Sequence, residues 1–358
     1  MNKQKKILIC PLDWGLGHAT RCIPLIDYFL QQGCEVMVAG NEITNTLIKT
    51  EFPALTFLDL KGYRVKYASS AWGLPFVIAR QIPRLLNTIR YEHHWLQQAI
   101  DTYAIDIVIA DNRYGLYSTK VPCVFITHQL QIAVPQSSFI QKWVNAMNHR
   151  MIKKFTAIWV PDVESHAMSG KLSAHNNELS QVSFIGNLSR FNLAKSVPLK
   201  YKIMVLLSGP EPQRSKLEAL VLSQLQHTQE PILVVRGKPD AQPIKPSNNQ
   251  IHMVNHLAKN DLQMALLQSA IIVCRSGYST IMDLIKLHKH AFLIPTPGQT
   301  EQEYLATYLA EKKWFLSVSQ AAFDINEAVI QFNVFTFEPF PEIATEGYKK
   351  AIDQLLQN

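Results

Sequence analysis

The sequence contains no run of apolar residues long enough to cross a membrane. Its N-terminus, MNKQKKILIC, is basic and then apolar, but the apolar run stops at Pro11 and Asp13, too early for a signal peptide core. The five cysteines are odd in number and never stand in a Cys-x-x-Cys spacing. They are typical of reduced core thiols rather than of a disulfide framework, so we expect a cytoplasmic protein.

Signatures of nucleic acid and metal binding are also missing. No zinc-finger spacing, base-reading basic helix or aromatic RNA-binding strand is present, so we expect no nucleic acid partner. No Asp-x-Asp pair or His/Cys cluster has ligand spacing, so we expect no metal and no cofactor. Of 358 residues, 47% are hydrophobic and 18% are charged, which is typical of a folded enzyme with two domains. The net charge of +7 leaves an anionic membrane or a phosphorylated substrate as candidate partners.

Short apolar runs alternate with helix-like segments along the first half of the chain. Because these runs lack polar alternation, they predict strands buried on both faces, and strands alternating with helices predict a parallel, doubly wound sheet. The predicted strands are 6–10, 35–39, 106–110 and 123–127, and the predicted helices are 18–32, 74–102 and 135–154.

A second series of the same kind follows a stretch without periodicity, Gly186 to Lys202, where we place the linker. Its predicted strands are 202–207, 231–235, 250–254, 270–274 and 291–295, and its predicted helices are 213–226, 258–269, 279–287 and 301–312. The sequence therefore predicts an N-terminal domain over 1–188, a C-terminal domain over 200–342, and a terminal helix within 343–358 that packs across the domain boundary.

The first strand-to-helix turn, Pro11 to Arg21, carries Gly15 and Gly17 and then His18. The glycines allow a tight turn that brings backbone amides close to a ligand. A dinucleotide-binding turn would need a third glycine where Thr20 stands, so a dehydrogenase is disfavoured. A helix N-terminus disfavours an imidazolium, so His18 is expected to stay neutral near pH 7 and able to accept a proton. The alternative is that His18 only caps or packs the turn.

The matching turn of the second series leaves the strand that ends at Cys274 and enters a helix. Free amides at a helix start, hydroxyls and the Arg275 guanidinium suit a diphosphate, and Asp283 lies one turn further, within reach of ribose hydroxyls. The alternative is a capped helix with a solvated acid. The candidate diphosphate ligands in this turn are Arg275, Ser276, Gly277, Tyr278, Ser279 and Thr280.

The next turn, Pro295 to Tyr304, is rich in Pro and Gly and places Gln299, Gln302 and Glu303 at a helix start. Ligands of open α/β sheets bind at the carboxyl edge of the strands, which both turns face. Two polar turns that converge on this edge favour a ligand site over simple helix caps.

These turns resemble the GT-B superfamily of glycosyltransferases, and within it the family of the peptidoglycan N-acetylglucosaminyltransferase. The Gly-x-Gly-His turn followed by Ala-Thr-Arg is similar to a bacterial and archaeal branch of predicted glycosyltransferases. The stretch Cys-Arg-Ser-Gly, an acid seven residues after its Ser, and a Pro-rich turn with Gln-x-Tyr resemble the donor site of the peptidoglycan enzyme. The resemblance covers nearly the whole chain and implies two Rossmann-like, doubly wound domains that face a cleft.

The resemblance also implies roles for the donor residues. Ser276 to Thr280 would meet the diphosphate, Asp283 the ribose, Leu257 the uracil through its backbone, and Gln302 the donor sugar. Ser208 and Gly209 would form the loop under the phosphates. This loop departs from the glycine-rich form of the family, since Pro210 and Pro212 intervene, and Asp283 stands where the peptidoglycan enzyme has Glu. These departures leave the identity of the sugar open.

Polar residues follow two further strands of the N-terminal half and are candidates for the acceptor side, together with the Gly15 and Gly17 turn. Asp111 and His128 have the chemistry to orient or deprotonate an acceptor hydroxyl, and Arg113 has the charge to meet an acceptor phosphate. The alternative is that all three form turns. For catalysis we single out His18 and Asp111.

The region Lys61 to Arg90 carries basic residues among large apolar ones and no Asp or Glu. Such a pattern suits the surface of an anionic bilayer, although a core-facing amphipathic helix gives the same pattern. A second cluster from Lys142 to Lys154 extends it. The peptidoglycan enzyme has an apolar and basic membrane patch in the corresponding region, which implies peripheral contact with the inner face of the membrane.

We therefore expect an inverting, metal-independent glycosyltransferase that moves a hexose or N-acetylhexosamine from a UDP-sugar to a hydroxyl acceptor, which the resemblance suggests is lipid-linked. One alternative is a UDP-sugar 2-epimerase, whose Gly-Thr-Arg-Pro-Glu type stretch is absent here. Another is a non-catalytic protein that binds a nucleotide or a lipid phosphate.

Overall fold

The computed structural model describes most of the chain, and its described residues form two units. These residues are 4–63, 74–132, 138–175, 179–193, 197–239, 241–244, 246, 248–343 and 346–357, with the backbone alone for 74–80 and 138. The first unit comprises the described parts of Met1–Lys66, Pro75–Arg190 and Glu342–Asn358, and the second those of Phe191–Pro341.

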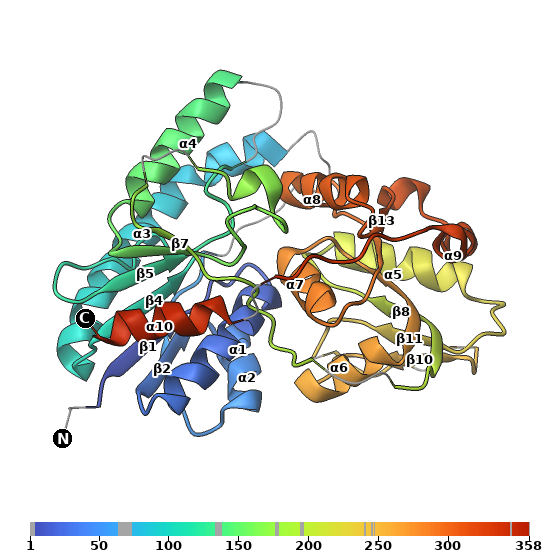
Figure 1. Ribbon diagram of the computed structural model, residues 1–358, viewed down its shortest axis with the longest axis horizontal. Coiled ribbons are helices and arrows are strands. Elements are labelled where there is room, and N and C mark those ends of the chain that lie inside the picture. The colour runs from blue at the N-terminus through green and yellow to red at the C-terminus, as the bar shows by residue number, and fades with distance from the viewer. Residues whose placement is uncertain are drawn as a thin grey trace. The chain divides into compact units, whose positions relative to one another are not determined.

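The first unit is built on a parallel sheet with the strand order β3-β2-β1-β4-β5-β6-β7 (Figure 1). Its strands are β1 (Lys6–Cys10), β2 (Glu35–Gly40), β3 (Thr56–Asp59), β4 (Ile107–Asp111), β5 (Cys123–Ile126), β6 (Ala157–Val160) and β7 (Val182–Phe184). All pairs of neighbouring strands are parallel. The predicted doubly wound sheet is confirmed, and its order reverses between β1 and β4, where sheets of this type bind ligands.

Helices cover both faces of this sheet, which is why its central strands read as unbroken apolar runs. Leu8 and Cys10 of β1 pack with residues of α3 and with Phe125 of β5 in one core cluster. The helices of this unit are α1 (Leu16–Gln31), α2 (Glu42–Glu51), α3 (Leu74–Tyr103), α4 (Ser138–Ile152) and α10 (Gly347–Gln357). Figure 1 shows α1, α2 and α10 on the face opposite α3.

The terminal helix α10 belongs to the first unit, although it follows the second unit in sequence. The Tyr28 hydroxyl of α1 donates to Asp353 at 2.9 Å, and the rings of Tyr28 and Tyr348 meet edge to face at 6.2 Å. Lys5 donates to the carbonyl of Leu356 at 2.6 Å. These contacts hold the end of the chain against α1.

The second unit repeats the architecture with the strand order β10-β9-β8-β11-β12-β13, again all parallel. Its strands are β8 (Tyr201–Leu206), β9 (Ile232–Val235), β10 (Ile251–Val254), β11 (Ser269–Cys274), β12 (Phe292–Leu293) and β13 (Leu316–Ser317). Its helices are α5 (Gln213–Gln224), α6 (Lys259–Leu267), α7 (Tyr278–Lys286), α8 (Thr300–Glu311) and α9 (Ile325–Val334). Leu217 of α5 and Ala328 of α9 share a core cluster with the strands.

The sequence pattern did not predict several of these elements. The strands β3, β6, β7 and β13 and the helices α2 and α9 were not predicted. The predicted strand over 291–295 is only two residues long in β12. β7 and β13 have only three and two residues, and β3 has exposed residues at both ends, so their apolar runs give little signal.

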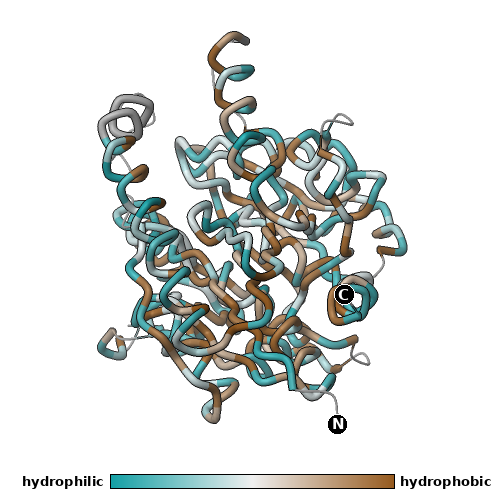
Figure 2. The backbone as a smooth tube through the Cα atoms, turned by 90° about the vertical axis from the view of Figure 1, so that its left-hand side faces the viewer, coloured by the Kyte–Doolittle hydropathy of each residue, from teal (hydrophilic) through white to brown (hydrophobic). Residues whose placement is uncertain are grey.

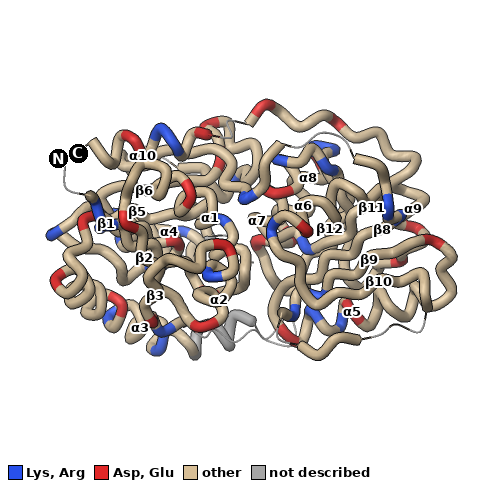
Figure 3. The backbone as a smooth tube through the Cα atoms, turned by 90° about the horizontal axis from the view of Figure 1, so that it is seen from below, with Lys and Arg blue, Asp and Glu red and all other residues tan. Residues whose placement is uncertain are grey.

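Among the described residues, no helix is long and apolar enough to span a bilayer. All five cysteines are buried and unpaired. Lys and Arg are interspersed with Asp and Glu over both units (Figure 3). In the described part of the chain the basic residues are therefore not confined to one unit.

Candidate active site

The first helix of the first unit begins with an open N-terminus. Gly15, at its N-cap, has φ = 102°, and a Cβ at this position would meet no atom within 4 Å. This backbone conformation favours glycine, and the space before it is free for a ligand. No side chain caps the helix, and its first turn holds no acidic residue. A helix N-terminus without a side-chain cap or an acidic first turn attracts anions and polar ligands.

His18 lies in this first turn and contacts Asp111, which is the last residue of β4. Cys10 pairs in register with Ala110, so Asp111 lies just beyond the end of β1, where α1 starts. The Nδ1 atom of His18 is 3.1 Å from Asp111 Oδ2. The Asp111 side chain is fully buried, whereas the His18 side chain is 16% exposed. The pair thus has a buried carboxylate behind a ring that solvent and ligands can reach.

Arg21, in the next turn of α1, contacts both members of this pair. Its Nε donates to Asp111 Oδ2 at 2.8 Å, and its Nη2 also donates to Asp111 Oδ1. Nη2 lies 2.9 Å from His18 Nδ1, and Nη1 lies 3.4 Å from Nδ1 of the buried His128. The structure therefore brings together three predicted residues, His18, Asp111 and His128, around an arginine that the sequence interpretation did not select.

The charges of this cluster shift its proton affinities. Burial opposes ionisation of Asp111, but Arg21 and His18 outweigh it and lower the pKa of this carboxyl to about 2. Burial lowers the pKa of His18, and Arg21 and His128 act in the same direction, while Asp111 opposes them. Near neutral pH the cluster consequently combines an ionised Asp111 with an uncharged His18, as a general base requires.

Arg113 does not have the position that its predicted role requires. Its side chain is fully buried, its Nη1 donates to Glu92 at 2.8 Å, and its Nε donates to the carbonyl of Pro11 at 2.9 Å. The Tyr63 hydroxyl donates to the same Glu92 carboxylate at 2.6 Å. Arg113 thus ties together the loops after β1 and β4, which is a different contact from the predicted one to an acceptor phosphate.

In the second unit, α7 also begins with an open N-terminus. Gly277 is its N-cap without a side-chain cap, and a Cβ there would meet no atom within 4 Å. Ser279 and Thr280 are partly exposed in the first turn, and Asp283 follows one turn later with 7% exposure. The side chains of Tyr278 and Ser276 are buried, and the Ser276 hydroxyl donates to the carbonyl of Gln302 at 2.8 Å.

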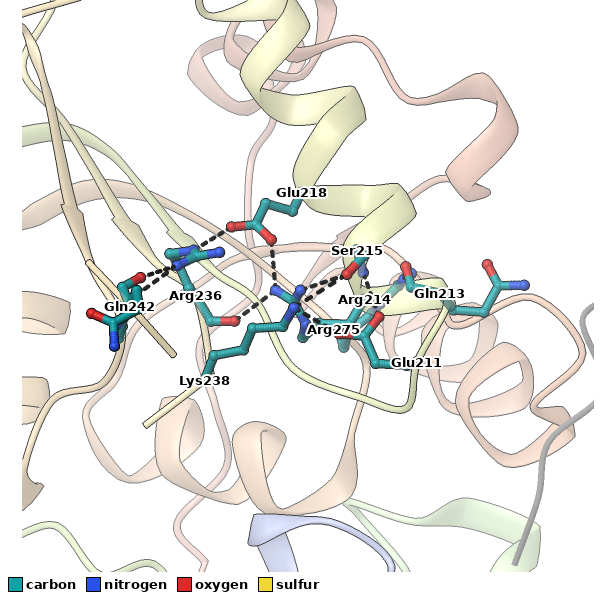
Figure 4. Close-up of polar contacts among 10 residues, drawn as sticks. Glu211, Gln213, Arg214, Ser215, Glu218, Arg236, Lys238, Gln242 and Arg275 are labelled. Atoms are coloured by element: carbon teal, nitrogen blue, oxygen red, sulfur yellow. Dashed lines mark hydrogen bonds and ion pairs between the residues drawn. The ribbon is translucent and has the colours of Figure 1, made fainter. Parts of the chain in front are cut away.

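Arg275 holds together the loops at this edge of the sheet. Its buried guanidinium donates to the carbonyls of Ile294, Pro295 and Gln213 at 2.9–3.2 Å and to Gln320 at 2.7 Å. Burial lowers the pKa of Arg275 to about 10. Instead of the predicted direct contact with a diphosphate, the described contacts of the side chain join the loops that follow β8 and β12. Figure 4 shows Arg275 near Gln213 and Arg214.

The remaining donor-side candidates lie on neighbouring loops. The Oε1 atom of Gln302 accepts from Thr296 N at 2.9 Å, and Nε2 of Gln302 donates to Gln299 at 2.5 Å. Gly209, with φ = 99°, follows Ser208 in the loop after β8 and faces Thr296 Oγ1, which would lie 3.5 Å from a Cβ at that glycine. Leu257 is partly buried just before α6. Because the strands are parallel, the loops after β8, β11 and β12 share one edge of the sheet.

A basic network at this edge was missed by the sequence interpretation (Figure 4). Arg214 bridges Glu211 at 2.8 Å and Glu218 at 2.9 Å, and Arg236 pairs with Glu218 at 2.5 Å. Lys238 contacts Glu211 at 3.1 Å. Arg214 also donates to the carbonyl of Arg236 at 3.0 Å. Among its three basic residues, Arg236 alone directly follows a strand, β9, so the strand pattern indicates only one member of the network.

Comparison with known proteins agrees with this arrangement. Residues 213–333 match the model of the glycosyltransferase family 28 C-terminal domain. Over 364 residues the chain is 20% identical to UDP-N-acetylglucosamine--N-acetylmuramyl-(pentapeptide) pyrophosphoryl-undecaprenol N-acetylglucosamine transferase of Pasteurella multocida (strain Pm70). The match covers 97% of this chain and 94% of that enzyme.

Solved structures show the same fold. Glycosyltransferase SnogD from Streptomyces nogalater superposes with a TM-score of 0.61 at 13% identity, covering 99% of this chain and 95% of that one. MurG from Acinetobacter baumannii superposes with a TM-score of 0.57 at 15% identity, covering 99% and 100% of the two chains. The chain is thus a glycosyltransferase of the GT-B fold whose residues 213–333 match the glycosyltransferase family 28 C-terminal domain.

Proposed function

We propose that this glycosyltransferase moves a hexose or N-acetylhexosamine from a UDP-sugar to a hydroxyl acceptor, with inversion at the anomeric carbon and without a metal ion. The observation that carries the proposal is the contact of the accessible His18 ring with the buried, ionised Asp111. A neutral imidazole backed by a carboxylate is an arrangement that activates a hydroxyl group.

The donor is assigned to the second unit. The start of α7 has no side-chain cap, and it places the Ser279 and Thr280 hydroxyls and the positive end of the helix where a diphosphate is expected. Asp283 is assigned to the ribose and Gln302 to the sugar. UDP is favoured because the Pasteurella relative is named for UDP-N-acetylglucosamine. No metal is assigned, since the amides and the helix dipole supply the electrostatic stabilisation that the leaving group needs.

The acceptor is assigned to the first unit, beside His18. With Nδ1 of His18 held toward Asp111, the second ring nitrogen, Nε2, is the atom that takes the proton from the acceptor hydroxyl. The oxygen then attacks the anomeric carbon from the face opposite the diphosphate, so that one bond forms while the other breaks and the configuration inverts. Gly15 leaves room for the acceptor at the start of α1, and Gly17 of the same turn is assigned to the acceptor side with it.

Incubation of the protein with a panel of UDP-sugars and hydroxyl acceptors tests this function. We expect UDP release that depends on the acceptor, persists in excess EDTA, and yields a glycoside whose anomeric proton coupling shows inversion. Release of a 2-epimer without acceptor would identify an epimerase instead, and loss of all activity in EDTA would contradict the metal-independent mechanism.

We further propose that the acceptor is lipid-linked and that α4 lies against the membrane. Phe139 is 78% and Trp143 is 55% exposed, and Ile140 and Met147 are also exposed on this helix. The helix carries no acidic residue and has Lys142 and Arg150 among its exposed side chains. Its N-terminal end is hydrophobic where it projects at the top of Figure 2. Basic and apolar residues in this arrangement favour an anionic lipid surface.

The other predicted membrane region, Lys61 to Arg90, is only partly within the described residues. Its candidates Arg64, Lys66 and Trp72 lie outside them, and for Leu74, Phe76, Ile78 and Arg80 the side chains are not described. Of the described side chains, Ile82 and Leu86 are exposed, as are Arg84 and Arg90. This part of α3 therefore adds apolar and basic side chains of the same kind as those of α4.

Vesicle cosedimentation tests the membrane proposal. Replacing Phe139 and Trp143 together with Ser should lower the partition coefficient onto anionic vesicles by about tenfold or more, because each large side chain contributes about 1.5–3 kcal/mol when it leaves water. Ile43→Ser removes an apolar side chain that is 56% exposed on α2 and serves as the matched control, which should bind as the wild type does. Unchanged binding of the double variant would contradict the role of α4.

A further inference from the structure

The Nδ1 atom of His18 is in contact with two groups of opposite hydrogen-bonding character. Asp111 Oδ2, which only accepts, lies at 3.1 Å, and Arg21 Nη2, which only donates, lies at 2.9 Å. A neutral imidazole nitrogen satisfies one of these groups at a time. With the proton on Nδ1, the ring donates to Asp111 and Nε2 can act as a base. With the proton on Nε2, that nitrogen has no lone pair left to accept a proton.

Arg21 has a fixed position in this cluster. It is 2% exposed, and both its Nε and its Nη2 donate to the Asp111 carboxylate. This two-point contact orients the carboxylate so that Oδ2 remains toward His18. The same contact neutralises the charge of Asp111 inside a buried site, where a charge interaction is strong.

The charge balance around His18 shows what this neutralisation achieves. The groups that face the ring or its carboxylate are Arg21 and Cys22 on α1, Asp111 on β4 and His128 after β5. Asp111 raises the pKa of His18, while burial, Arg21 and His128 lower it. Without the arginine, a lone buried carboxylate would face the imidazole, and the two would form an ion pair with the ring protonated.

We propose that Arg21 is a positioning residue that keeps His18 unprotonated at neutral pH and holds the Asp111 carboxylate against Nδ1, so that Nε2 faces the acceptor as a free base. The proposal rests on the proposed function in one respect, the role of His18 as the base. Arg21 itself touches no reacting atom, and its effect passes through Asp111 and His18.

The test is an NMR titration of the His18 ring in the wild type and in Arg21→Gln, with the resonance identified among the 12 histidines by its loss in His18→Gln. Arg21→Gln removes the positive charge that opposes Asp111. The pKa of His18 should then rise by about one pH unit or more, which is the effect of a carboxylate within about 4–6 Å. The acidic limb of the kcat/KM profile should move to higher pH by the same amount. Arg21→Lys keeps the charge, so the His18 pKa and the acidic limb should both lie close to their wild-type values.

Two further variants separate charge from structure. Arg21→Gln combined with Asp111→Asn removes both charges, so the His18 pKa should fall again, below that of Arg21→Gln alone. Arg113→Gln breaks another buried arginine–carboxylate pair of the same unit, one with no contact to His18. It should lower the melting temperature without moving the His18 titration or the acidic limb.

The outcomes distinguish this proposal from the proposed function. A His18 pKa that does not rise in Arg21→Gln overturns the role of Arg21, whether or not the enzyme is active. The pKa of His18 could also rise in a protein that transfers no sugar from any donor. That result would support the charge role of Arg21 and contradict the assignment of His18 as the base. If Arg21→Gln does not fold, Asp111→Asn carries the test: the uncompensated arginine should then lower the His18 pKa, and an unchanged value overturns the proposal.

Discussion

Replacing His18 with Gln should lower kcat for sugar transfer by about 10²- to 10⁴-fold, the range that a positioned general base contributes. Gln has a similar reach and polarity but takes up no proton at neutral pH. Because His18 lies on α1 of the first unit and the donor is assigned to the second, the KM for the UDP-sugar should change little. Initial rates at saturating acceptor, with UDP release as the readout, measure both constants.

The pH profile provides an internal check on this variant. Burial, assisted by Arg21 and His128, lowers the pKa of His18, so the acidic limb of the wild type should lie below the ordinary histidine value. Activity is present above this pKa and is lost as the pH falls through it, and the limb should vanish in His18→Gln. His227→Gln changes an exposed histidine of the second unit and serves as the control. Near-wild-type activity of His18→Gln would exclude His18 as the base.

The sequence predicts the central strands of both sheets well for a physical reason. β1, β4 and β5 are buried on both faces, so their short unbroken apolar runs are typical of a parallel sheet covered by helices. The edge strand β3 has partly exposed residues, so its run is not distinct from loop sequence. β6 is as short as β5 and almost as buried, and its length does not explain why it was missed. The helix α2 is short and nearly neutral in mean hydropathy, with only Thr44 and Ile48 buried, which gives no strong stripe.

The predicted site residues fall into two groups in the structure. His18 and Asp111 were each selected because they follow a strand, and the strand order brings them into contact. Arg113 and Arg275 were selected by the same rule, but their long side chains turn inward to satisfy carbonyls of neighbouring loops. The backbone position of a residue at a sheet edge follows from sequence pattern, whereas the direction of an arginine side chain depends on which buried acceptors need a donor.

The roles of Arg21 and Arg214 were beyond the sequence pattern for a related reason. Arg21 stands one turn after His18, where a basic residue normally lies in solvent, and only the position of Asp111 on another strand explains its burial. Arg214 likewise bridges two acids and the loop after β9. Such networks involve residues far apart in the chain, and a single sequence does not pair them.

The central claim is that the second unit binds a UDP-sugar at the start of α7, and calorimetric titration with UDP tests it most directly. We expect UDP to bind more tightly than UMP or GDP. Asp283→Ala should weaken UDP binding by about 10- to 100-fold, the equivalent of about 1.5–3 kcal/mol for a lost hydrogen bond to a charged group. Glu311→Ala, which removes an exposed acid at the far end of α8, should bind UDP as the wild type does. Absence of nucleotide binding, or equal UDP affinity in Asp283→Ala and the wild type, would contradict the donor site.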